Sequence, residues 1–227
     1  MRSTLRAGFT DRLEAGRLLG QQLKRRPLRD PLVLAIPRGG VATGLALAEE
    51  LGAELDVVLS RKLRAPYQPE YAIGAISEDG HLLLDAHAAA ACEADEAYLE
   101  REKRHQLAEI ARRAKLFRTV RPQASLSGRS VIVTDDGIAT GSTMIAALQT
   151  ARAKEPHELI MAVPVAPPQR LRVLRRLCDD AVCLLSPESF RAVGEFYEDF
   201  SELNDDEAVA LLRRASRPDE SDVSRAV

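Results

Sequence analysis

The sequence predicts an α/β fold, in which a doubly wound parallel sheet flanked by helices is followed by a small C-terminal lobe. Two observations predict it. Short, nearly uninterrupted apolar runs alternate with helical stretches along most of the 227 residues, and such runs are typical of strands buried on both faces of a parallel sheet. Two of these runs also lead directly into glycine-containing turns that precede helices, as the strands of doubly wound folds do.

The apolar runs define the expected strands. They span residues 32–36, 55–59, 131–133, 159–165 and 181–185. Because each run is short and contains few polar residues, we expect the strands to form one sheet that helices cover on both sides.

Helices are expected between these strands. Thr10 is the predicted N-cap of the first helix, and the helix after the first strand is expected over residues 41–51, ending at Gly52. Apolar residues at helical spacing mark these elements and two later helices: Leu13, Leu19 and Leu23; Met144, Leu148 and Ala151; Leu171, Leu174 and Leu177.

Two regions depart from the alternation. Residues 72–77 and 81–84 are expected to be strands on either side of a Glu-Asp-Gly turn. Residues 85–117 are expected to form one long, charged helix that is solvated except for one packed stripe, marked by Leu107, Ile110, Ala114 and Phe117. On this helix Glu109 and Arg113 lie four residues apart in the orientation that favours an ion pair.

These elements suggest a division of the chain. Residues 1–185 form the expected α/β core, with the long helix at about 86–117 as an insertion. Residues 186–214 form the C-terminal lobe and a helix, and residues 215–227, which are charged and lack apolar anchors, are expected to be disordered.

Composition excludes several classes of function. The net charge is −2 with both signs dispersed, so no basic field indicates a nucleic-acid partner. No apolar run approaches the ~20 residues that span a bilayer, and the first residues lack the apolar core of a signal peptide. The three cysteines show no metal-ligand spacing and are expected to be buried free thiols in a reducing compartment. We therefore expect a cytoplasmic protein.

The most informative segment is VIVTDDGIATGST, residues 131–143. A buried strand ends at Asp135 and Asp136, a turn of small residues follows, and Ser142 and Thr143 begin a helix. Free N–H groups at a helix start, together with the helix dipole, favour an anion. Glycines in the turn allow several amides to converge on one phosphate, and the hydroxyl groups of the turn add donors.

The two aspartates indicate a further ligand group. Carboxylates beside a phosphate site would repel the phosphate unless they accept hydrogen bonds from sugar hydroxyls or hold Mg²⁺. The plainer alternative is a strand that ends in a polar turn, with Asp136 as a helix cap. Two rival phosphate motifs are not present in this segment: it lacks GxGxxG, and no lysine follows Gly141 as a P-loop requires.

This segment resembles the signature of the type I phosphoribosyltransferases. AIPRGGVATGLALAEELGAELDVVLSRKL and PEYAIGAISEDG resemble a subgroup of that family with unassigned substrate, and FRAVGEFYEDFSEL is similar to that subgroup's hood. The resemblance implies that 5-phosphoribosyl pyrophosphate binds with Mg²⁺, held through the substrate and by Asp135 or Asp136. It also implies a mobile catalytic loop at residues 63–71 and a pyrophosphate loop at residues 37–40, where the family often has a non-proline cis peptide.

The resemblance assigns roles to individual residues. Asp135 and Asp136 would hold the ribose hydroxyls, and Arg38 and Lys62 would meet the pyrophosphate. The implied catalytic residues are Asp135, Asp136, Lys62 and Arg38, and the implied substrate-binding residues are Gly39, Arg61, Gly137, Ile138, Ala139, Thr140, Gly141, Ser142 and Thr143. For the 5-phosphate, the donors would be the amides of residues 138–142 and the hydroxyls of Thr140, Ser142 and Thr143.

Departures from the family pattern concern the acceptor. Ala139 stands where hypoxanthine-guanine enzymes have an aspartate, which argues against that substrate class. Phe190 and Tyr197 of the hood could stack on a planar acceptor or simply pack the lobe. No general base is identified; the acidic and imidazole side chains of the region are Glu70, Glu78 and His81, and each is better explained as a solvated loop residue.

The expected function is transfer of 5-phosphoribose to an unidentified nitrogen acceptor, within nucleotide metabolism and with release of pyrophosphate. A non-catalytic sensor of phosphoribosyl pyrophosphate or of a nucleotide is the alternative, since one fold hosts many functions. A Rossmann-like nucleotide binder is the weakest of the three. Assembly into a homo-oligomer is left open.

Overall fold

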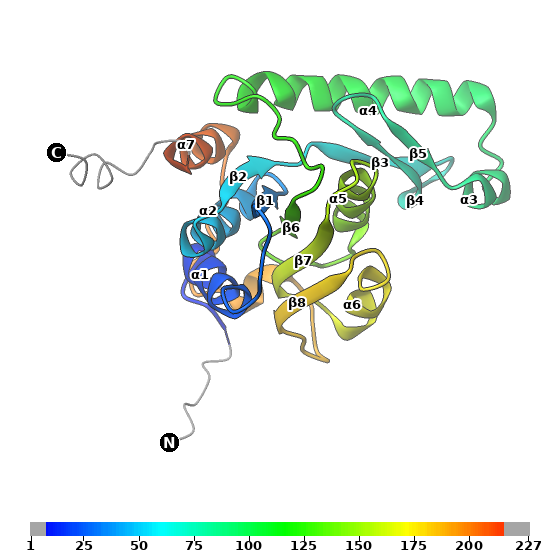
Figure 1. Cartoon of the computed structure of the whole chain (residues 1–227). Helices are drawn as coiled ribbons and strands as arrows, with labels where there is room; N and C mark the ends of the chain where they lie inside the picture. The colour runs from blue at the N-terminus through cyan, green and yellow to red at the C-terminus, as the bar shows by residue number, and fades with distance from the viewer. Residues whose placement is uncertain (1–7, 216–227) are drawn as a thin grey trace.

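The computed structural model describes residues 8–215. Its centre is a parallel sheet of five strands in the order β2-β1-β6-β7-β8 (Figure 1). The strands are β1 (Leu32–Ala35), β2 (Glu54–Val57), β6 (Ser130–Thr134), β7 (Glu158–Val165) and β8 (Asp180–Leu185). All four pairings are parallel, so the predicted doubly wound sheet is confirmed.

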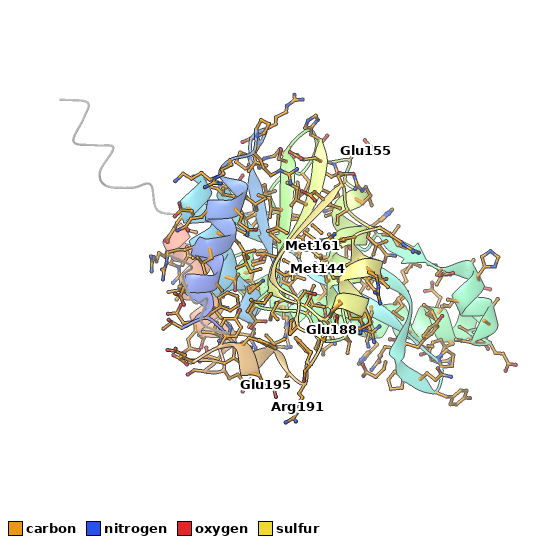
Figure 2. The ribbon with its side chains drawn as sticks, turned by 90° about the horizontal axis from the view of Figure 1, so that it is seen from below. Met144, Glu155, Met161, Glu188, Arg191 and Glu195 are labelled. Carbon is orange, nitrogen blue, oxygen red and sulfur yellow. The ribbon has the colours of Figure 1, made fainter. Side chains whose placement is uncertain are left out.

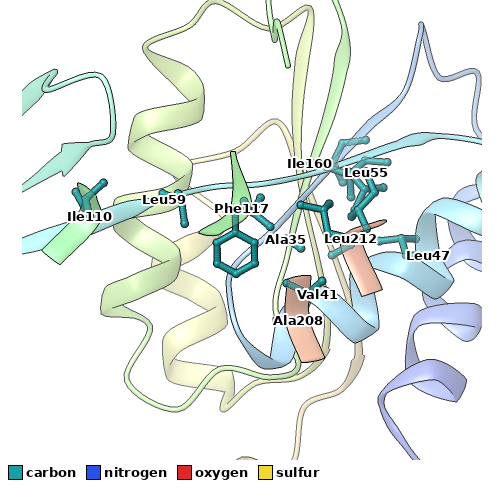
Figure 3. Close-up of a cluster of buried hydrophobic side chains, with 14 of the residues drawn as sticks. Ala35, Val41, Leu47, Leu55, Leu59, Ile110, Phe117, Ile160, Ala208 and Leu212 are labelled. Carbon is teal, nitrogen blue, oxygen red and sulfur yellow. The ribbon is translucent and has the colours of Figure 1, made fainter. Parts of the chain in front are cut away.

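Helices cover both faces of this sheet, as the continuous apolar strands require. The helices are α1 (Arg12–Leu23), α2 (Gly39–Leu51) and α7 (Asp205–Ala215) on one face, and α5 (Ser142–Arg152) and α6 (Pro168–Leu174) on the other. Alternate residues of β1 divide between the faces: Val33 and Ala35 pack with the first group, and Leu32 and Leu34 with the second. Figure 3 shows part of the first cluster, including Leu212 of α7.

The start of α1 differs from the prediction. Asp11, not Thr10, is the N-cap: its backbone is extended, and its carboxylate accepts a hydrogen bond from the amide of Glu14 at 2.7 Å. Both residue types cap helices well. Asp11 is the cap because α1 begins one residue later than expected, at Arg12.

A second, antiparallel sheet extends from the core. It consists of β3 (Ser60–Ala65), β4 (Gln68–Ser77) and β5 (Leu82–Leu84). The strands predicted within 72–84 are therefore present. The segment 63–71, expected to be a loop, instead folds into the β3–β4 hairpin. β3 is difficult to predict as a strand because half of its residues are Arg or Lys. Its Leu63 and Ala65 are nevertheless buried.

The expected single helix at 85–117 is two helices, α3 (Ala86–Ala91) and α4 (Glu96–Phe117). Between them Glu93 adopts a φ of 52°, and Asp95 caps α4 through the amide of Tyr98 at 2.6 Å. The expected packed stripe of α4 is present: Ile110 and Phe117 are buried, and Leu107 and Ala114 pack against the same cluster. The expectation did not include Glu102 and Gln106, whose side chains are also buried.

The C-terminal part of the chain packs against two different parts of the protein. Residues 186–204, with the short 3₁₀ helix η1 (Val193–Phe196), lie against the N-terminal segment, where Phe9 and Tyr197 pack with a ring distance of 5.4 Å. Figure 2 shows Glu195 at the outer edge of this lobe, whereas Met161 lies in the interior. The following α7 packs into the central core instead. Apart from Ala215, which ends α7, the tail predicted to be disordered lies outside the described residues.

Two smaller expectations concern cysteines and membranes. Cys92, Cys178 and Cys183 are free thiols, and each is half-buried rather than fully buried as expected. Within residues 8–215, no helix has both the length and the apolar character that crossing a bilayer demands.

Candidate phosphate site

The two loops singled out in the sequence meet at one point of the sheet. β1 and β6 are neighbours, paired from Leu32↔Val131 to Ala35↔Thr134, so their carboxyl ends coincide. The order β2-β1-β6 reverses direction between β1 and β6. Doubly wound sheets bind ligands in the crevice at such a switch point, and both loops lie at its mouth.

The turn after β6 has the geometry of an anion site. Gly141 has a φ of 84°, which glycine adopts without strain, and α5 begins directly after it. The amides of residues 139–143 donate no hydrogen bond to any other group in residues 8–215. These amides, with the dipole of α5 behind them, can therefore donate to an anion.

Two other residues of the turn serve the fold. The amide of Ile138, expected as a phosphate donor, already donates to the carbonyl of Val165 at 2.8 Å, and the side chain of this residue is buried. A Cβ atom on Gly137 would lie 2.5 Å from a methyl group of Val193. This glycine therefore permits contact with η1, and its φ is not in the left-handed region.

The turn after β1 packs closely against the aspartates. The Pro37–Arg38 peptide bond is cis, as the family resemblance implied. A Cβ atom on Gly39 would lie 1.9 Å from Oδ2 of Asp136, and one on Gly40 would lie 3.0 Å from Cα of Asp135. Only glycine fits at the first of these positions, so the two loops are held in direct contact.

Asp136 has a partner that sequence reasoning missed. Nε of Arg12 in α1 donates to its carboxylate at 2.8 Å, and the guanidinium lies 3.8 Å from the ring centroid of Phe200. The hydroxyl of Tyr197 donates to the Asp136 carbonyl at 2.5 Å. Nothing in the spacing of α1 indicated Arg12, because the contact joins residues 124 positions apart.

Asp135 lies directly after β6, next to Asp136. Burial, together with the neighbouring carboxylate of Asp136, raises its pKa well above the ordinary value. Its Oδ1 accepts a hydrogen bond from the Asp136 amide at 2.9 Å. The pair thus consists of one carboxylate that is paired with an arginine and one whose charged form is disfavoured by its surroundings.

A cavity of about 340 Å³ adjoins the turn after β6. Among the predicted residues, it is lined by Arg61, Lys62, Thr140, Ser142 and Thr143. Sequence reasoning missed its lining by Arg64 of β3 and by Gln106, Ile110 and Arg113 of α4. Arg38, Gly39, Gly137, Ala139 and the two aspartates do not line this cavity, although they belong to the loops beside it.

The cations of β3 are held in different ways. Nε of Arg61 donates to the side-chain oxygen of Gln106 at 2.6 Å, and Lys62 pairs with Glu70 at 3.2 Å. Arg64 forms two hydrogen bonds with Glu102, at 2.7 and 3.0 Å.

Glu102 anchors the hairpin to α4. Burial alone would raise the pKa of its carboxyl group, but hydrogen bonds from Arg64 and Gln106 lower it to about 2. The inserted helix therefore positions the basic strand beside the cavity.

Outside the cavity, Arg38 pairs with Glu202 at 2.7 Å. Glu78, expected to be solvated, instead pairs with Arg118 at 2.6 Å, so that expectation is wrong.

The ring of Phe190 stacks on Phe196. Phe190 and Tyr197 therefore already pack within the lobe.

The chain is similar to one known protein family in sequence and to a solved structure in both sequence and fold. Residues 12–201 match the model of the phosphoribosyl transferase domain family. A Mycobacterium tuberculosis H37Rv protein named "Putative phosphoribosyl transferase Rv0571c" is 43% identical over 209 residues, 92% of this chain and 47% of that protein. The chain thus spans about half the length of the curated relatives it matches. The crystal structure of the Thermus thermophilus protein TT1426 is 43% identical with a TM-score of 0.87, covering 92% of this chain and all of that one.

Proposed function

Because the chain belongs to the phosphoribosyl transferase domain family, we propose that it transfers the 5-phosphoribosyl group of 5-phosphoribosyl pyrophosphate to a nitrogen acceptor and releases pyrophosphate. This substrate has a phosphate ester at one end and a diphosphate at the other. The observation that carries the proposal is one cavity with a donor set for each end: the turn that starts α5, with Thr140, Ser142 and Thr143, and the cations of β3.

The volume of the cavity supports a ligand of this size. Small-molecule sites usually have roughly 300–1,000 Å³, and this one has about 340 Å³. A single phosphate ion would need only one of the two donor sets.

The residues present fit Mg²⁺ that is carried mainly by the substrate. Within the described part of the chain, no cluster of three or more His, Cys, Asp or Glu side chains could hold a metal ion. Mg²⁺ commonly binds through one or two carboxylates together with substrate phosphates, and Asp135 and Asp136 are the carboxylates beside the site. When bound to the diphosphate, Mg²⁺ would neutralise part of the charge on the leaving group.

In the proposed reaction, the bond between the anomeric carbon and the pyrophosphate oxygen breaks and a carbon–nitrogen bond forms. The electron pair of the broken bond leaves with pyrophosphate, and the proton of the acceptor nitrogen passes to solvent. Arg61 and Lys62 stabilise the departing charge. Asp135 accepts hydrogen bonds from the ribose hydroxyls, while Arg12 holds Asp136 in place.

Pyrophosphate release tests this proposal. The protein is mixed with phosphoribosyl pyrophosphate, Mg²⁺ and a panel of nucleobases and amines, and we expect release with at least one acceptor. Asp135→Asn combined with Asp136→Asn should abolish both release and binding of the donor. The exposed Asp206→Asn in α7 serves as the matched control and should change neither.

Two results would reject an enzyme. If the wild type binds the donor in a calorimetric titration but releases no pyrophosphate with any acceptor, the sensor is supported instead. If neither the wild type nor the double variant binds the donor, both functions fail.

A further inference from the structure

Arg113 of α4 is the least expected residue at the cavity. It follows Gln106 and Ile110 at positions i, i+4 and i+7 of one helix face, and all three side chains line the cavity. Ile110 belongs to the same buried cluster as Leu59, which also lines the cavity (Figure 3). The sequence pattern paired Arg113 with Glu109 on a solvated surface, but residues 8–215 show no such ion pair.

The hydrogen-bonding capacity of Arg113 is unused in part. Its Nε is buried and has no hydrogen-bond partner. Burial lowers the pKa of the guanidinium, Asp205 opposes this shift, and the nearby cations Arg61, Arg112 and Arg38 lower the pKa further. A buried donor without an acceptor is costly, and repulsion among the nearby guanidinium groups disfavours the charged form of Arg113.

The nearby carboxylates are assigned mostly to other cations. Glu70 pairs with Lys62, Glu102 with Arg64, and Glu202 with Arg38. Asp205 lies 3.6 Å from Arg112, and the described residues include no carboxylate within ion-pair distance of Arg113 or Arg61. Two cations therefore face the same cavity without a paired anion.

We infer that Arg113 is a binding residue for the diphosphate end of the substrate, contributed by the inserted helix α4 and acting with Arg61. This inference rests on the proposed function. An arginine can donate two parallel hydrogen bonds to phosphate oxygens, and Gln106 holds Arg61 on the same wall of the cavity. Helix α4 thus completes the leaving-group site as well as supporting the hairpin.

Calorimetric titrations with inorganic pyrophosphate and, separately, ribose 5-phosphate test this inference on the full chain in the presence of Mg²⁺. For Arg113→Gln we expect about ten-fold or more weaker binding of pyrophosphate, the size of one charge-assisted hydrogen bond, and unchanged binding of ribose 5-phosphate. Arg113→Lys should recover part of the loss because it restores the charge. Arg112→Gln is the matched control, since Arg112 is an exposed neighbour outside the cavity, and its affinities should equal those of the wild type.

The outcomes distinguish a failure of the role of Arg113 from a failure of the proposed function. If the wild type binds both ligands and Arg113→Gln binds pyrophosphate equally well, the role of Arg113 is refuted while the proposed function stands. An equal loss of both ligands, accompanied by a lower Tm, would mean that Arg113 acts on the fold, which also refutes it. If the wild type binds neither ligand, the proposed function itself fails.

Discussion

Replacing Glu102 with glutamine should loosen the hairpin that carries the basic residues of the cavity. The carboxylate is 6% exposed and accepts hydrogen bonds from the Arg64 side chain and from Gln106. Glutamine keeps the shape but replaces one acceptor oxygen by an NH₂ group. One donor of Arg64 then faces another donor, and the negative charge is lost.

The pKa of Glu102 gives the magnitude. Lowering it from 4.5 to about 2 corresponds to about 3 kcal/mol of stabilisation. Because the Arg64 side chain is 37% exposed, solvent screening reduces this figure to about 1–2 kcal/mol. The folded-state pKa is depressed, so the stabilisation is fully present above about pH 4.5 and is lost as the pH falls towards 2.

Urea unfolding followed by circular dichroism measures this contribution. At pH 7 we expect Glu102→Gln to lower the free energy of unfolding by about 1–2 kcal/mol, and the difference from wild type should shrink as the pH falls from about 4.5 towards 2. Glu100→Gln is the control on the same helix; Glu100 is 57% exposed and lies 3.6 Å from Lys103, so we expect less than about 0.5 kcal/mol. A difference for Glu102→Gln no larger than that of the control, or one that does not change with pH, would refute the reasoning.

Three further predictions follow from other contacts. Gly39→Ala places a methyl group 1.9 Å from Asp136, so binding of phosphoribosyl pyrophosphate should weaken more than ten-fold in calorimetry; unchanged affinity would contradict the loop contact. Leu212→Ala should lower the free energy of unfolding by about 2–5 kcal/mol in urea because Leu212 is fully buried; a loss below about 1 kcal/mol would mean that α7 is peripheral. Burial raises the pKa of Cys183 to about 11, so this thiol should react slowly with a disulfide reagent at about pH 8 and quickly in denaturant; rapid modification of the native protein would contradict its burial.

The central sheet could be predicted from the sequence because its strands are buried on both faces. Runs such as 159–165 have no polar side, and this composition is typical of a parallel strand that is covered on both faces. The second sheet was harder to predict. β3 carries Arg61, Lys62 and Arg64, so its composition resembles a polar loop, and its pairing with β4 depends on contacts that local pattern does not contain.

In the site, too, local features could be predicted from the sequence and contacts between distant segments could not. Local geometry, such as the turn at Gly141 and the strand end at Asp135, could be read from neighbouring residues. Contacts between distant segments could not: Arg12 reaches Asp136 from α1, and Arg113 reaches the cavity from α4. For Arg113 the helical spacing of Gln106, Ile110 and Arg113 was a usable signal, since it places them on one face. The charged surroundings favoured the solvated interpretation instead.

The amides of residues 139–143 can be observed directly by ¹⁵N–¹H correlation spectra of the labelled protein. Titration with ribose 5-phosphate should move these amide protons downfield as they donate to the phosphate oxygens, whereas ribose without phosphate should leave them unchanged. If the ester binds while these five signals stay in place, or if it does not bind at all, the turn that begins α5 is not the phosphate site.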